Sequence, residues 1–191
     1  MSDFTNTTVP PHAEVAGILH CVRASDALRS VRLAFEFQVL TAMPSTTVFH
    51  ARWDEMELKG AVWTVPADRM KSRRRLRVPL SPQALAVLAE ARELGSGEGP
   101  VFPNTRGGPL SASSLSILLR RLGIQVTPHS FRASFRDWCA ETGVLHDHAE
   151  LCLGRSIPDM HNVRCPSERL VPRRKVMEDW GAYVLPDAFQ G

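Results

Sequence analysis

The sequence predicts a mainly helical α+β fold with a small antiparallel sheet on one edge. Through most of the 191 residues, apolar side chains recur at helical spacing, and Ser, Thr or Asp precedes several of these runs as a candidate N-cap. Between Met56 and Leu80 the apolar period changes to two, which indicates short strands. A hydrophobic content of 43% is enough for one buried core and argues against disorder.

The N-terminal part of the chain is expected to hold a polar arm and then two helices. Residues 1–11 are polar, end in proline and form the arm. A second helix is predicted over residues 26–40, capped by its first residue. Pro44 disfavours helix at the residue before it, and Ser45 or Thr46 can cap a short helix that follows. The apolar positions expected to be buried are Val15, Ile18, Leu19 and Val22 in the first helix and Leu28, Val31, Phe35 and Val39 in the second.

The connection between the later predicted strands is strongly basic. It places six cations within nine residues and contains no acid: Arg69, Lys71, Arg73, Arg74, Arg75 and Arg77. Such a cluster attracts a polyanion such as nucleic acid. The alternative is a solvated loop whose charges keep an edge strand from pairing. We favour nucleic acid, because protecting an edge needs one or two charges.

The second half of the chain is predicted to be helical, with turns where glycine and proline gather. Ser81 and Pro82 begin one helix, and Ser111 caps another. A second basic cluster stands near the start of the final helix, where it opposes the helix dipole and suggests an external partner. It consists of Arg169, Arg173, Arg174 and Lys175. The helices are expected over residues 82–94, 111–122, from 127 to the break at 143, over 147–153, and from 171 or 172 to 183.

The stretch from Thr127 to Trp138 carries the clearest chemistry. Thr127 can cap a helix whose start would favour an anion, and His129 and Arg132 are neighbours on it. A phosphate there would meet an imidazole and a guanidinium fork. The alternative is a capped amphipathic helix with solvated arginines. The apolar face of the helix is formed by Phe131, Phe135 and Trp138.

Composition excludes several classes of protein. The net charge is only +3, so an argument for nucleic acid depends on where the cations cluster. The four cysteines lack metal-ligand or disulfide spacing, so we expect no metal site and a reducing, cytoplasmic setting. No apolar run approaches the ~20 residues that span a bilayer, so no membrane partner is expected.

Nine short blocks, in order along the chain, resemble the catalytic domain of the phage-integrase or tyrosine-recombinase family. The blocks are Leu40-Thr41-Ala42, Ala51-Arg52-Trp53-Asp54-Glu55, Ala61-Val62-Trp63-Thr64-Val65-Pro66, Arg69-Met70-Lys71, Arg77-Val78-Pro79-Leu80-Ser81, Val101-Phe102-Pro103, Arg106-Gly107-Gly108-Pro109, Pro128-His129-Ser130-Phe131-Arg132 and Phe135-Arg136-Asp137-Trp138. The resemblance implies one catalytic domain over residues 12–191, without the family's separate N-terminal core-binding domain.

The resemblance also implies roles for individual residues. Enzymes of this family cut DNA with a tyrosine and keep the phosphate as a covalent link, without a metal or nucleotide cofactor. Arginines neutralise the phosphate charge, and a hairpin lysine protonates the leaving oxygen. Lys71 matches that lysine, and His129 and Arg132 match the second box.

Three other family positions are substituted. Pro44 stands where the first arginine is expected, and Arg155 stands where the second histidine is expected. Cys165, with Arg164 as the one-residue alternative, takes the place of the nucleophilic tyrosine. The chain's single tyrosine, Tyr183, falls on the apolar stripe of the last helix and is read as a packed aromatic.

These substitutions predict a protein that binds double-stranded DNA but is impaired or inactive in strand cleavage. It would be associated with DNA recombination or integration, and it could work as a homo-oligomer or beside a recombinase on DNA. The basic residues 69, 73, 74, 75 and 77 are the expected DNA contacts, and no cofactor is implied. Two alternatives remain: an active recombinase with an atypical nucleophile, and a decayed remnant without a DNA function.

Overall fold

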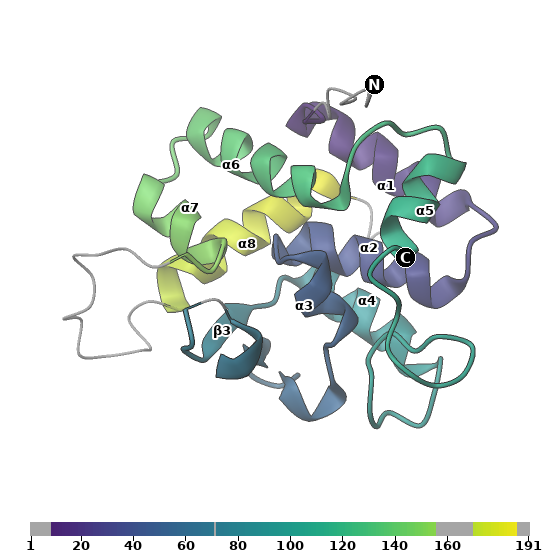
Figure 1. Ribbon diagram of the computed structural model, residues 1–191. Coiled ribbons are helices and arrows are strands. Elements are labelled where there is room, and N and C mark those ends of the chain that lie inside the picture. The colour runs from purple at the N-terminus through teal and green to yellow at the C-terminus, as the bar shows by residue number, and fades with distance from the viewer. Residues whose placement is uncertain (1–8, 71, 156–169, 187–191) are drawn as a thin grey trace, which may run out of the picture.

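The computed structural model describes residues 9–70, 72–155 and 170–186, and it confirms the predicted mainly helical α+β fold (Figure 1). In chain order the elements are α1 (Val15–Ala24), α2 (Arg29–Thr41), α3 (Ser45–Phe49), β1 (Met56–Glu57), β2 (Val62–Val65), β3 (Leu76–Pro79), α4 (Pro82–Arg92), α5 (Ser114–Arg121), α6 (Phe131–Glu141), α7 (His146–Cys152) and α8 (Leu170–Val184). Single 3₁₀ turns cover His12–Glu14, Trp53–Glu55, Ala67–Arg69 and Pro128–Ser130.

The sheet is antiparallel throughout, in the order β1-β2-β3. Trp63 of β2 lies opposite Met56 on one side and Val78 on the other. Its side chain is fully buried, so the sheet turns its apolar face to the helices. The chain follows the predicted change of period between Met56 and Leu80.

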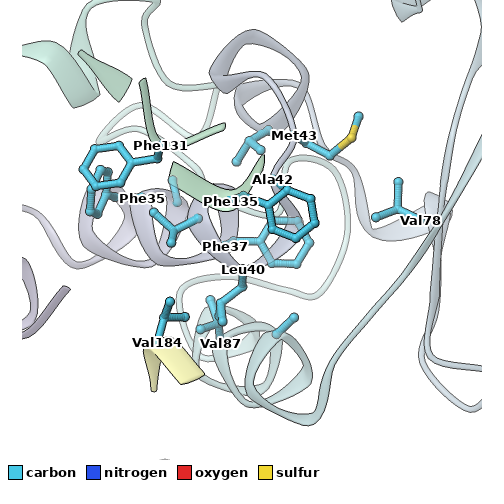
Figure 2. Close-up of a cluster of buried hydrophobic side chains, with 14 of the residues drawn as sticks. Phe35, Phe37, Leu40, Ala42, Met43, Val78, Val87, Phe131, Phe135 and Val184 are labelled. Carbon is cyan, nitrogen blue, oxygen red and sulfur yellow. The ribbon is translucent and has the colours of Figure 1, made fainter. Parts of the chain in front are cut away.

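Helix α2 is the centre of the fold, and the helices α1, α3, α4, α5 and α8 contact it (Figure 1). Ten of its residues are buried. Trp180 of α8 donates a hydrogen bond from Nε1 to the carbonyl of Val39 at 2.8 Å. Phe35 meets Phe131 of α6 edge to face, with ring centroids 5.0 Å apart (Figure 2). These contacts fix the start of α6, which carries the predicted phosphate chemistry, against the central helix.

The predicted apolar face of α6 is confirmed. Phe131, Phe135 and Trp138 are all buried. Phe135 and Trp138 pack on Trp180 with centroids 5.4 and 5.3 Å away. Aromatic packing therefore joins α6 to α8.

Some predicted helix starts were wrong. Helix α2 begins at Arg29, and Leu28 is 46% exposed where it was expected to be buried. Pro44 takes the N-cap position of α3, and its side chain makes no capping hydrogen bond. Ser81 does cap α4, because its hydroxyl accepts from the Ala84 amide at 3.2 Å. Where extended backbone and proline already fix a helix start, a capping side chain is dispensable.

Two residues of the basic cluster at the start of α8, Arg173 and Arg174, have internal roles, so no external partner is needed to explain them. Lys175 is exposed and pairs with Asp179 of the same helix, and Arg169 lies outside the described residues. Arg173 is buried and donates to the carbonyls of Leu151 and Arg77 at 3.2 and 2.7 Å. Arg174 donates to the carbonyl of Gly60 at 2.9 Å. These guanidiniums tie α8 to α7 and to the sheet.

The predicted N-terminal arm is docked at its C-terminal end. Pro10 is buried, and its carbonyl accepts a hydrogen bond from the hydroxyl of Ser134 on α6. Residues 1–8 lie outside the described part of the chain.

Candidate nucleic-acid interface

A pocket of about 600 Å³ brings together family-motif positions that lie far apart in the sequence. Its wall combines the loop and helix after α2, the 3₁₀ turn before α6, the end of α7 and the start of the basic hairpin. The lining residues are Pro44, Thr46, Thr47, Arg69, Met70, Ser72, His129, Arg132, Leu153, Gly154 and Arg155. The site is therefore built from segments up to about a hundred residues apart, which only the fold brings together.

Arg132 lies at the back of this pocket and is only 8% exposed. Its two terminal nitrogens donate to backbone carbonyls, one to Ala42 and the other to Leu153 at 2.8 Å. A guanidinium has five N–H donors, so these bonds leave others for a ligand. Part of the fork that the sequence assigned to phosphate thus holds two loops together.

The environment of Arg132 makes its charge costly. Loss of hydration on burial is the main effect that lowers its pKa, to about 10, and the charge of Arg155 lowers it further. The Glu150 carboxylate acts in the opposite direction. At neutral pH Arg132 remains charged, and an anion in the pocket would relieve this cost.

His129 lies in the 3₁₀ turn that precedes α6, and not in the α-helix itself. The Thr127 side chain makes no capping hydrogen bond, contrary to the sequence prediction. The turn is held instead by the buried Gln38 amide of α2, which donates to the Pro128 carbonyl at 2.5 Å. Loss of hydration at the pocket wall lowers the pKa of His129, and the charges of Arg132 and Arg155 lower it further. The free imidazole is therefore neutral near pH 7.

Arg155 reaches the pocket from the turn after α7, and Glu150 holds it there. Its Nη1 contacts both carboxylate oxygens of Glu150, at 2.9 and 3.2 Å. On its other side Glu150 pairs with Arg136 of α6, with Nε 3.3 Å from the carboxylate. The two arginines share a carboxylate whose side chain is only 12% exposed.

Pro44 is in the wall of the same pocket and contributes no charge. Thr46 and Thr47 line the wall beside it. Two other residues predicted for the site, Lys71 and Cys165, lie outside the described residues.

The basic residues of the hairpin differ in their exposure and in the contacts that they make. Arg69 pairs with Glu55 and donates to the His50 carbonyl, so its charge is used inside the fold. Arg77 lies 3.6 Å from the Glu57 carboxylate. Arg73, Arg74 and Arg75 are exposed at the tip of the hairpin. Exposure at the tip leaves the side chains of these three within reach of an external polyanion.

Tyr183 has its hydroxyl 2.8 Å from Nδ1 of His12, and the other ring nitrogen of His12 lies 2.8 Å from Glu141. Its ring packs on Trp180 and Trp138. With 40% of the residue exposed, it is a partly packed aromatic, and it is not among the residues that line the pocket.

Sequence reasoning missed two residues that shape the site, Glu150 and Gln38. Both are polar and buried, which is the signal of an internal partner. Their partners cannot be read from spacing, because Gln38 and Pro128 are ninety residues apart and Arg136 and Glu150 lie on different helices.

The described residues contain no group of three or more potential metal ligands. Burial raises the pKa of the thiols of Cys139 and Cys152 to about 12, so both are protonated and unreactive. In the described part of the chain, no helix has the length and apolar character needed to cross a membrane.

Comparison with known proteins gives sequence relatives among integrases. Residues 11–160 match the model of the phage integrase family. The chain is 30% identical over 174 residues to prophage integrase IntA of Escherichia coli K12, which covers 87% of this chain and 42% of the relative. It is 30% identical over 176 residues to the integrase of Enterobacteria phage P4, covering 80% of this chain and 40% of that protein. The chain thus spans about two-fifths of the length of these relatives.

Solved structures share the fold at low identity. An integrase from mycobacterium phage Brujita superposes with a TM-score of 0.66 at 15% identity, covering 94% of this chain and 65% of the other. A lambda integrase tetramer bound to a Holliday junction gives 0.63 at 18% identity, covering 86% and 51%. These likenesses speak for the fold, and the match over residues 11–160 decides the family. The chain belongs to the phage integrase family.

Proposed function

We propose that this chain binds double-stranded DNA through the pocket and the basic hairpin, in association with DNA recombination or integration, and is impaired or inactive in strand cleavage. By the resemblance to the family, His129 and Arg132 would be retained site residues, while Pro44 and Arg155 would occupy substituted positions. Lys71 would complete the retained set, and Cys165 stands at the position of the nucleophile.

The observation that carries the proposal is the convergence of His129, Arg132 and Arg155 on one pocket, which Pro44 also lines. Three nitrogen-bearing side chains suit a phosphate oxygen. The exposed arginines at the hairpin tip would meet neighbouring phosphates of the same duplex.

Loss of cleavage follows from what the site lacks. Removing one donor that stabilises transition-state charge costs roughly 10²–10³ in rate, and removing the nucleophile costs more. A thiol at position 165 would be a poor substitute, because the next residue in the sequence is proline, which disfavours the interior of a helix. We therefore assign phosphate binding to the pocket and not phosphate chemistry.

The DNA-binding half of the proposal is tested by measuring binding to a labelled duplex, of about 25 base pairs and mixed sequence, at several salt concentrations. The binding constant should fall steeply as salt rises, because each phosphate contact releases roughly 0.9 counterion. Arg75→Gln at the hairpin tip should reduce the logarithmic slope by about one unit. Arg29→Gln is the matched control, since Arg29 is a partly exposed arginine paired with Glu93, the residue that follows α4. A slope near zero for the unmodified protein would favour a decayed remnant without a DNA function.

Assembly on DNA is part of the proposal. The lambda integrase structure that shares this fold is a tetramer bound to a Holliday junction. We infer that this chain binds DNA as a homo-oligomer or beside a recombinase partner. Sedimentation with and without the duplex measures the stoichiometry.

The alternative function is an active recombinase with an atypical nucleophile. Cys165 is the candidate that motivates it, because a thiolate is strongly nucleophilic. A covalent adduct with DNA that disappears in Cys165→Ala would establish it.

A further inference from the structure

We propose that Arg155 is the second arginine of the phosphate pocket, acting with Arg132, and that Glu150 is the residue that positions it. The inference rests on the proposed function, because it concerns how the same pocket grips a DNA phosphate. Under this proposal, Arg155 supplies the positive charge that the arginine expected at position 44 would have supplied.

The backbone places Arg155 beside Arg132. Arg132 donates to the carbonyl of Leu153, and Arg155 follows two residues later in the same turn. Gly154 allows this turn, because its φ of +69° is a left-handed conformation that L side chains rarely adopt. A Cβ at Gly154 would also lie 2.9 Å from the side chain of Leu76 on β3. The turn that carries Arg155 is thus tied to α6 and pressed against the sheet.

Glu150 holds Arg155 at two points. Its carbonyl accepts from the Arg155 amide at 3.0 Å, and its carboxylate receives Nη1 of the Arg155 side chain at 2.9 and 3.2 Å. Among the residues that the structure describes, no further hydrogen bond engages the guanidinium of Arg155. Its Nε and Nη2 therefore remain as donors for a ligand, and the side chain is 49% exposed.

Because Nη1 of Arg155 is held by Glu150, Nε and Nη2 are already positioned to donate to a phosphate. A free arginine loses considerable rotamer entropy when it grips a phosphate, and a side chain held in advance loses less. The carboxylate also offsets the repulsion between Arg155 and Arg132, which adds to the larger effect of burial in lowering the pKa of Arg132. A phosphate would complete the neutralisation that Glu150 begins.

Two substitutions separate the roles in the salt titration with the same duplex. Arg155→Gln should weaken binding about ten-fold and lower the salt slope by about one unit, as for a lost charge-assisted phosphate contact. Arg29→Gln again serves as the control, since Arg29 has a similar exposure and an ion pair with Glu93. If Arg155→Gln matches this control, Arg155 does not contact a phosphate.

Glu150→Gln tests positioning through the sign of its effect. Removing a negative charge beside the pocket would tighten DNA binding if Glu150 acted only through its field. Positioning predicts the reverse, about ten-fold weaker binding with a smaller salt slope. Glu150→Asp keeps the charge with a shorter reach and should fall between. Unchanged or tighter binding in Glu150→Gln, with a native circular dichroism spectrum, would overturn the positioning role.

A double-mutant cycle makes the test independent of folding losses. In the Arg155→Gln background, Glu150→Gln should cause no further loss of affinity if it acts through Arg155. An equal loss in both backgrounds would contradict this. Failure of the proposed function looks different, because the unmodified protein would then show no salt-dependent DNA binding at all.

Discussion

Arg132 donates a hydrogen bond to the carbonyl of Leu153 at 2.8 Å, so a side chain of the proposed phosphate pocket also fixes the turn that carries Arg155. Its other terminal nitrogen donates to the carbonyl of Ala42, next to the loop that contains Pro44. One guanidinium thus joins three walls of the pocket. Its substitution has consequences for stability as well as for binding.

Arg132→Met should lower the free energy of unfolding by about 3 kcal/mol, because two buried carbonyls would lose their donors. Arg132→Lys should cost less, since an ammonium can still serve one carbonyl. Urea titration at pH 7 measures both. An unchanged midpoint in Arg132→Met would show that the carbonyls find other donors.

Stability should depend on pH through His129. Its pKa is lowered in the folded protein, so between that value and the unfolded value near 6.5 the unfolded chain binds more protons. The contribution of neutral His129 is therefore fully present above about pH 6.5 and is lost as the pH falls toward the folded pKa. As the pH is lowered from 8 to 5, the urea midpoint should fall less steeply in His129→Gln than in the unmodified protein. Parallel curves for the two proteins would argue against the shift.

Arg173 and Arg75 should separate stability from DNA binding. Arg173→Met should destabilise the fold by about 2 kcal/mol, because Arg173 is buried and donates to two carbonyls. The salt dependence of DNA binding should be the same in Arg173→Met as in the unmodified protein. Arg75→Gln should lower the salt slope and leave the urea midpoint unchanged. A lower salt slope in Arg173→Met would restore the external role that the sequence suggested for it.

Tyr183→Phe should affect neither DNA binding nor any residual chemistry. The change removes one hydrogen bond, to His12, at a partly exposed position, and should cost about 1 kcal/mol or less. Anisotropy and urea titration test the two statements. A marked loss of DNA affinity would place Tyr183 at the interface.

The overall fold could be predicted because its signals are local. Helical spacing located the apolar face of α6, and the change of period at Met56 located the sheet. Helix boundaries were less predictable, since α2 begins at Arg29, beyond the expected cap, and Thr127 does not cap the turn before α6. A residue that can cap a helix marks a possible start in the sequence. Tertiary packing decides whether the helix starts there.

The pocket was predictable in its positions and not in its hydrogen bonds. Spacing and family resemblance indicated His129, Arg132 and Arg155, which do line one pocket. The burial of Arg132, and the contact of Glu150 with Arg155, depend on where α7 packs against α6. Long-range polar contacts of this kind leave no periodic pattern in a sequence.

A covalent-adduct assay tests the central claim most directly. The protein is incubated with a nicked suicide duplex, on which a cleaving recombinase would be trapped, at a salt concentration where anisotropy shows the duplex to be bound. We predict bound DNA and no protease-sensitive covalent adduct. A covalent adduct that is lost in Cys165→Ala or in Tyr183→Phe would contradict the account and identify the protein as an active recombinase.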